Sequence, residues 1–214
     1  MKAYLILEDG TVFTGTSIGS QREVISEIVF NTSMTGYLEV LTDPSYAGQA
    51  VVMTYPLIGN YGICRQDMES LKPWPDGYIV RELSRIPSNF RCEDTIQNFL
   101  EENDIPGICG IDTRALTKLL REKGTMNGMI TTKEYSDLSE PISRMKAYTV
   151  AGVVMATTTK EKYVLPGYGK KRKRLRQDYY RRFRKHRKND FIRSYQRKRV
   201  RYMRKTYGLR NDDF

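Results

Sequence analysis

The sequence predicts a mixed α/β fold in which strands come first and helix–strand units follow. Residues 2–83 contain short apolar or alternating segments separated by turn residues, a pattern typical of β-strands. Residues 92–131 alternate apolar residues at helical spacing with short apolar runs, which indicates helices that each lead into a strand. No internal repeat is visible, and 214 residues suffice for one domain of ordinary size and an additional segment.

The first part of the chain is expected to be rich in strands. Residues 3–15 ("AYLILEDGTVFTG") form two β-rich runs joined at Asp9-Gly10, which predicts a hairpin. Residues 23–32 ("EVISEIVFNT") alternate polar with apolar side chains, as in a strand with one face in solvent. Two short Val/Ile-rich runs, 48–56 ("GQAVVMTYP") and 76–83 ("DGYIVREL"), indicate buried strands.

A helix followed by a strand is predicted within residues 92–112 ("CEDTIQNFLEENDIPGICGID"). Its apolar stripe consists of Ile96, Phe99 and Leu100, at the spacing that places side chains on one helical face. Ile105-Pro106 ends the helix because proline cannot continue the hydrogen-bond pattern.

The clearest helix is predicted within residues 112–130 ("DTRALTKLLREKGTMNGMI"). Asp112 is suited to cap its amino terminus, and Gly124 stands where a carboxyl-terminal cap belongs. A strand follows, and a further short helix is expected near residues 140–148. Three leucines repeat at helical spacing: Leu116, Leu119 and Leu120.

Charge divides the chain into two parts. The net charge is +11, but residues 170–214 hold 20 Lys and Arg against 4 Asp and Glu, whereas residues 1–169 hold 16 against 21. The balance is therefore +16 in residues 170–214 and −5 in residues 1–169. A mildly acidic globular part is expected to precede a basic tail that is helical or disordered.

Cysteine usage and hydropathy favour a cytoplasmic protein. Cys64, Cys92 and Cys109 lie at wide spacings without a C-x-x-C pair or a nearby histidine, which favours reduced thiols over disulfides or a zinc site. No apolar run approaches the roughly 20 residues that span a bilayer. The start has an Asp-Gly turn where a signal peptide would have its cleavage region. We therefore expect no membrane association, no metal and no cofactor in this chain.

Residues 31–56 place many hydroxyl side chains between two strands. In Asp43-Pro44-Ser45-Tyr46, proline sets φ and the aspartate can accept hydrogen bonds from the backbone, so a turn is predicted. Such a turn is expected to present Ser45 and Tyr46 outward to a polar ligand or a partner. The alternative is that these hydroxyls only satisfy their own backbone.

Several long segments together resemble a known family. They are "FNTSMTGYLEVLTDPSYAGQ", "TYPLIGNYG", "SNFR", "GICGIDTRALTKLLREKG" and "NGMI", in this order. They resemble the amino-terminal domain of the small subunit of glutamine-hydrolysing carbamoyl-phosphate synthetase, over about residues 2–152 and weakly through residues 160–169. The resemblance implies a β/β/α swivelling-type fold.

The resemblance also implies a function and a glutamine contact. In that family a class I amidotransferase domain with a Cys-His-Glu set follows, and its ammonia reaches a large subunit. The large subunit uses ATP and bicarbonate to make carbamoyl phosphate for pyrimidine and arginine biosynthesis. The serine of the "DPSY" loop helps bind glutamine between the two domains, which implies that role for Ser45. For the polar residues that precede it, a structural or subunit-contact role is expected: Asn31, Thr32, Ser33, Thr35 and Gly36.

The sequence offers no catalytic set for glutamine hydrolysis. A cysteine glutaminase needs a thiolate beside a general base, and the single histidine, His186, stands among Arg184, Lys185 and Arg187. No cysteine lies in a Gly-x-Cys-x-Gly elbow. Asp112 with Arg114 could form a catalytic pair or a substrate clamp, but a helix cap beside a surface charge is the favoured interpretation. We therefore expect a chain without the amidotransferase domain, inactive as a glutaminase alone.

Three segments are predicted: a synthetase small-subunit domain at 1–152, a linker at 153–169 and a basic tail at 170–214. Basic and aromatic residues interleave in the tail, as in nucleic-acid-binding segments. Leu175, Tyr179 and Phe183 would also share one face of a basic amphipathic helix. A frameshift or truncation is the other explanation of the tail. The alternative function is thus a non-catalytic module that binds nucleic acid.

Overall fold

The structure is a computed structural model, and it describes residues 1–161. Its first two strands form the predicted hairpin: β1 (Lys2–Leu7) pairs antiparallel with β2 (Val12–Gly19). The turn is closed by a hydrogen bond of 2.9 Å from the Leu7 amide to the Thr11 carbonyl. The Thr11 amide in turn donates to Asp9 Oδ1 at 2.9 Å, so the aspartate supports the turn as its position predicts.

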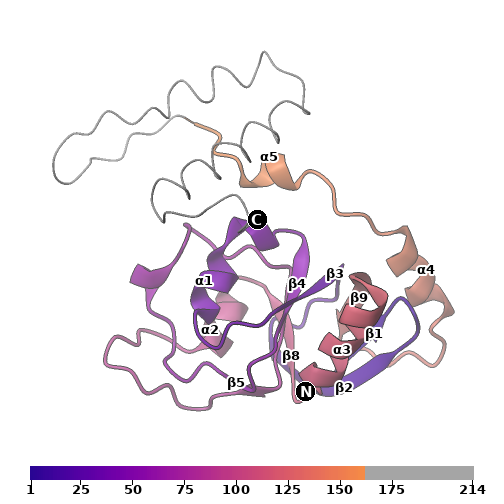
Figure 1. Cartoon of the computed structure of the whole chain (residues 1–214), viewed down its shortest axis with the longest axis horizontal. Coiled ribbons are helices and arrows are strands. Elements are labelled where there is room, and N and C mark those ends of the chain that lie inside the picture. The colour runs from indigo at the N-terminus through magenta and orange to yellow at the C-terminus, as the bar shows by residue number, and fades with distance from the viewer. Residues whose placement is uncertain (162–214) are drawn as a thin grey trace, which may run out of the picture. The chain divides into compact units, whose positions relative to one another are not determined.

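Seven strands close into a barrel, which removes the unpaired edges that an open sheet would expose (Figure 1). The order around the barrel is β1-β2-β8-β6-β4-β3-β9, and β9 pairs with β1 to close it. The five barrel strands that follow the hairpin are β3 (Val24–Asn31), β4 (Gln49–Met53), β6 (Gly77–Ile79), β8 (Pro106–Cys109) and β9 (Met126–Thr131).

Four neighbouring strands of the barrel, β3, β4, β6 and β8, run parallel to one another. Their carboxyl ends therefore lie at one end of the barrel, and each connection between them must cross back. The first crossover contains α1 (Tyr37–Thr42) and a 3₁₀ turn, η1 (Pro44–Tyr46); α2 (Ile96–Glu102) precedes β8. The second crossover contains β5 (Leu57–Ile58) and η2 (Arg65–Asp67). β5 pairs in a separate parallel sheet with β7 (Glu82–Leu83).

The helix after β8, α3 (Thr113–Lys123), has the predicted caps. Asp112 Oδ1 accepts hydrogen bonds of 3.0 Å from the amides of Arg114 and Ala115, and the Gly124 amide donates to the Leu120 carbonyl. Because α3 starts after β8 and leads into β9, which is antiparallel to β3, both its ends lie at the carboxyl end of the parallel strands. The helix therefore lies across that end of the barrel.

The core has layers on both faces of the sheet. Val52 belongs to the inward-facing cluster, which Leu116 and Leu120 of α3 join, whereas Val51 packs with α1 and α2 on the outer face. Leu119 packs only partly against the inner cluster. The residues of β4 are thus buried on both sides, which confirms the buried strand predicted from "GQAVVMTYP". Strands approach closely at Gly107, where an added Cβ would stand 2.7 Å from the Tyr78 carbonyl.

The strand-rich α/β class and the order of elements are confirmed, with two corrections. The single strand expected at 76–83 is divided: β6 ends at Ile79, and β7 belongs to the other sheet. A helix, α1, was not expected within the hydroxyl-rich segment. The short helix near 140–148 is present as α4 (Ser139–Ala147), and a further one, α5 (Val153–Thr157), lies where a linker is expected. The predictions for His186 and for the tail lie outside the described residues.

Candidate functional site

The hydroxyl-rich segment leaves the barrel at Asn31, the last residue of β3. The Asn31 side chain makes two hydrogen bonds: its Oδ1 accepts from the Ser33 amide at 2.7 Å, and its Nδ2 donates to the Tyr46 hydroxyl at 2.9 Å. One amide thus holds the start of the segment and joins it to the turn at residues 43–46. Asn31 therefore has a structural role, as expected.

A pair of tyrosines supports the start of α1. Tyr37 and Tyr61 are stacked with ring centroids 4.1 Å apart, and the Gly36 amide donates to the Tyr61 hydroxyl at 2.8 Å. The Tyr37 hydroxyl donates to the Gly62 carbonyl at 2.7 Å. Burial is the main cause that raises the pKa of both phenols, so both hydroxyls remain neutral. Gly36 has a φ of 83°, which favours glycine.

Ser45 lies in the turn that its sequence predicts. Its amide donates to Asp43 Oδ1 at 2.8 Å, so the aspartate carboxylate satisfies the backbone of the turn. The residue is exposed, and its hydroxyl makes no hydrogen bond to any other residue of 1–161. Tyr46, which was expected to point outward with Ser45, does so only in part: it lines a surface hollow, but it is half-buried, packs against the α1–α2 core, and its hydroxyl accepts a hydrogen bond from Asn31.

A hollow of about 460 Å³ lies beside this turn, and we call it the acidic hollow. Three carboxylates, Glu39, Asp43 and Glu69, line it together with hydroxyl residues of the segment. Ser45 is not among its lining residues, although both of its neighbours are. The hollow is therefore suited to a cationic group, with the Ser45 hydroxyl outside it. The remaining lining residues are Asn31, Ser33, Thr35, Gly36, Val40, Pro44 and Tyr46.

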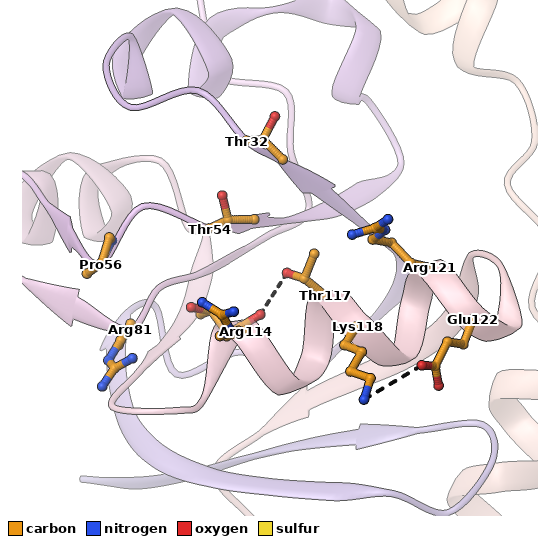
Figure 2. A pocket seen from close by; sticks show the side chains of 10 residues that line it. Thr32, Thr54, Pro56, Arg81, Arg114, Thr117, Lys118, Arg121 and Glu122 are labelled. Atoms are coloured by element: carbon orange, nitrogen blue, oxygen red, sulfur yellow. Dashed lines mark hydrogen bonds and ion pairs between the residues drawn. The ribbon is translucent and has the colours of Figure 1, made fainter.

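A larger cleft, of about 760 Å³, lies where α3 crosses the barrel end (Figure 2). We call it the basic cleft because four cationic side chains line it: Arg81, Arg114, Lys118 and Arg121. Its other lining residues are Thr32, Thr54, Pro56, Thr113, Thr117 and Glu122. Sequence reasoning missed this cleft and considered Arg114 only beside Asp112. The available signal was that Thr32, Thr54 and Arg81 each follow a strand of the parallel set.

The other candidate groups have structural roles. Asp112 uses its carboxylate to cap α3. This confirms the helix cap, which was the interpretation favoured over a catalytic pair with Arg114. The three cysteines form no disulfide with one another, Cys64 is buried, and the Cys92 thiol donates to the Asp94 carbonyl at 3.3 Å. Burial raises the pKa of Cys109, which disfavours a thiolate there. Trp74 anchors its loop through a bond of 2.8 Å from Nε1 to Ser70 Oγ.

Residues 1–161 hold neither a metal-binding cluster nor a candidate membrane span. No group of three or more His, Cys, Asp or Glu side chains is arranged to hold a metal ion there. Nor does that part of the chain contain a helix long and apolar enough to cross a membrane.

Comparison with known proteins identifies relatives that match 72% to 80% of the chain. The small chain from Clostridium perfringens, a carbamoyl phosphate synthase small chain, is 53% identical over 171 residues, which cover 80% of this chain and 49% of the relative. The corresponding small chain of Caldanaerobacter subterraneus is 51% identical over 160 residues, covering 72% and 45%. A pyrimidine-specific small chain from Halalkalibacterium halodurans is 49% identical over 172 residues, covering 80% and 47%.

The chain spans about half the length of the curated relatives it matches. Their names give no support to a nucleic-acid-binding module, the alternative that rests on residues 170–214. The family model of the carbamoyl-phosphate synthase small chain, CPSase domain, matches residues 5–130. These residues extend from β1 to β9 and include the lining of the acidic hollow and of the basic cleft. The chain therefore belongs to the carbamoyl-phosphate synthase small-chain family.

Proposed function

We propose that this chain serves as the small chain of a carbamoyl-phosphate synthase, through a scaffold domain that associates with a large synthetase chain. The observation that carries the proposal is the family match over the whole barrel, together with a sequence identity of 53% to the small chain from Clostridium perfringens. In this proposal the domain is of the β/β/α swivelling type and comprises residues 1–152, residues 153–169 form a linker, and 170–214 form a basic tail. The protein is cytoplasmic.

Within this function, Ser45 contacts glutamine. Its hydroxyl is exposed and makes no hydrogen bond within residues 1–161, and the Asp43 carboxylate fixes the backbone of its turn. A free hydroxyl on a fixed turn can donate to a substrate carbonyl or carboxylate. The three carboxylates of the acidic hollow next to it favour a positively charged group such as the α-ammonium of glutamine. Both features support a glutamine contact at this edge of the domain.

The 214 residues are not expected to hydrolyse glutamine by themselves. Glutaminase chemistry needs a thiolate beside an oriented base, and the one histidine of the sequence has three basic neighbours and no carboxylate next to it. Burial disfavours the Cys109 thiolate, and Cys64 is buried. In the proposed assembly a large chain would use free ammonia, with bicarbonate and ATP, to form carbamoyl phosphate for pyrimidine and arginine biosynthesis.

Activity measurements test this proposal. The purified chain is combined with the large chain of the same organism, and carbamoyl phosphate is measured with glutamine or with ammonium chloride. We expect synthesis with ammonia and none with glutamine. Glutamine-dependent synthesis that disappears in a Cys64→Ala, Cys92→Ala or Cys109→Ala variant would overturn the expected inactivity.

The role of Ser45 needs a complete glutamine site. An amidotransferase domain from a relative is supplied in trans, and glutamine hydrolysis is measured for the wild type, Ser45→Ala and the control Ser88→Ala, an exposed serine that lines neither the acidic hollow nor the basic cleft. Loss of one hydrogen bond worth about 1 kcal/mol should raise KM about fivefold in Ser45→Ala and leave the control unchanged. Equal KM values for all three proteins would exclude the contact. Without that domain, NMR titration at low millimolar glutamine should show no saturable shifts at Ser45 or Tyr46.

A further inference from the structure

The basic cleft lies at a position where α/β sheets bind ligands. Thr32 follows β3, Thr54 follows β4 and Arg81 follows β6, and these strands are neighbours and parallel. Ligands of parallel sheets commonly bind outside the carboxyl ends of the strands. Here α3 lies across that same end, and its first residues, Thr113 and Arg114, complete the lining. Residues far apart in the sequence thus form one concave surface (Figure 2).

The cleft has a strong excess of positive charge. Four cations line it against one carboxylate, Glu122, whose Oε1 lies 3.9 Å from Lys118 Nζ. The amino terminus of α3 adds a partial positive charge at the end where Arg114 stands. This excess of positive charge attracts anions from solution.

The cations of the cleft differ from most other arginines of the described chain in having no carboxylate partner. Within residues 1–161, no salt bridge joins Arg81, Arg114 or Arg121 to an aspartate or glutamate. Elsewhere in that part of the chain, arginines are paired at nitrogen–oxygen distances of 2.7 to 3.9 Å: Arg22 with Asp104, Arg65 with Glu93 and Glu102, Arg91 with Asp67, and Arg144 with Glu23. The cleft therefore has three guanidinium groups for carboxylates from outside this domain.

The shape and the rim favour a polypeptide over a single small anion. Arg114 and Arg121 are seven residues apart on one helix, a span of about 10 Å along its axis, which exceeds one phosphate or carboxylate. An exposed aromatic side chain stands between two lining residues in sequence: Tyr55, which is 39% exposed, lies between Thr54 and Pro56. Arginine and tyrosine are residue types that protein interfaces enrich. Extended charge with an aromatic neighbour is thus typical of a protein-docking surface.

We infer that the basic cleft docks an acidic segment of the large synthetase chain. This inference rests on the proposed function, because it assigns a surface to the association proposed there. Carboxylates of the partner pair with Arg81, Arg114 and Arg121, and Tyr55 contacts apolar side chains beside them. The acidic hollow, which carries the opposite charge, remains free for the glutamine site.

Binding of the full 214-residue chain to the large chain tests the inference by calorimetry. Arg114→Glu and Arg121→Gln are compared with Lys133→Glu, an exposed lysine that follows β9 and so lies at the opposite end of the barrel. We expect Arg114→Glu to raise Kd tenfold or more, Arg121→Gln to raise it several-fold, and the control to leave it unchanged. Arg114→Lys should restore most of the affinity, and the melting temperatures of the variants report whether each remains folded.

The outcomes separate the two proposals. If the wild-type chain does not bind the large chain, the proposed function fails. If it binds and both cleft variants bind equally well, the function stands and the docking surface is overturned. Inorganic phosphate is titrated into the chain in parallel by NMR. Saturable shifts at Arg81 and Arg114 without an effect of the variants on large-chain binding would show a small-anion site instead, which also overturns the inference.

Discussion

The side chains of Asn31 and Tyr46 are joined by a hydrogen bond of 2.9 Å between Nδ2 and the phenolic oxygen. The bond connects the end of β3 with the turn that carries Ser45, across the whole first crossover. Because Ser45 itself is exposed, its position depends on such contacts of its neighbours rather than on packing of its own side chain. The geometry of the proposed glutamine contact therefore depends on Asn31 as well as on Asp43.

Tyr46→Phe removes that bond and leaves the ring in place. We expect a loss of about 1 kcal/mol in the free energy of unfolding, because the half-buried Asn31 amide loses its acceptor. Faster amide exchange at Ala47, which donates to the Pro44 carbonyl, should accompany it. Tyr55→Phe is the matched control, since this exposed hydroxyl makes no hydrogen bond within residues 1–161. Equal stability of the two variants would contradict the prediction.

Tyr78→Phe is expected to leave the protein as stable as the wild type or to stabilise it by about 1–2 kcal/mol. The Tyr78 hydroxyl is fully buried and has no hydrogen-bond partner among residues 1–161, so it loses hydration without compensation. Tyr37→Phe is the contrasting variant and should destabilise by about 1 kcal/mol, because it loses the bond to the Gly62 carbonyl. Urea unfolding measures both. Destabilisation of Tyr78→Phe to the same extent would reveal a buried water as its partner.

Asp112→Ala should destabilise the protein by about 1 kcal/mol. The substitution removes the acceptor of two amides at the start of α3, which is the usual cost of losing an amino-terminal cap. Asp112→Asn keeps a capping oxygen and should recover most of the stability. Chemical denaturation of the three proteins provides the measurement. If the alanine variant is as stable as the asparagine variant, the capping role is wrong.

Stability is expected to fall in acid through Glu23. Burial raises the pKa of this carboxyl, but hydrogen bonds from Tyr135 and Thr131 and the nearby Arg144 outweigh burial and lower the pKa overall. A lowered pKa in the folded state means that the stabilisation is present above the unfolded value of about 4.3 and is lost as the pH falls through the folded value.

Urea unfolding of the wild type and Glu23→Gln between pH 7 and pH 3 measures this effect. The wild type should exceed the variant by about 1–3 kcal/mol at pH 7, and the difference should shrink below about pH 4. Glu134→Gln changes an exposed carboxyl and is the control. A difference that stays constant over this range would show that the charge of Glu23 is not the cause.

Features that depend on neighbouring residues could be predicted from the sequence alone. The Asp9-Gly10 hairpin, the Asp112 cap and Gly124 at the end of α3 were predictable because each rests on hydrogen bonds within a few residues. The turn at Ser45 is of the same kind, since Asp43 bonds an amide two residues away. The order of strands and helices followed from apolar spacing, which is also local.

The barrel, the acidic hollow and the basic cleft arise only from contacts between distant parts of the chain. Closure depends on the pairing of β1 with β9, whose residues are more than 120 positions apart, and no local pattern specifies such a partner. Other long-range pairings, of β4 with β6 and of β5 with β7, divide residues 76–83 between two sheets, and the parallel set brings Thr32, Thr54 and Arg81 to one barrel end. The hydrogen bond between Asn31 and Tyr46 likewise joins residues 15 positions apart, on either side of α1. The local conformation of these residues depends on their neighbours in the sequence. Their positions relative to one another depend on long-range strand pairing, which requires the packed faces of the whole barrel.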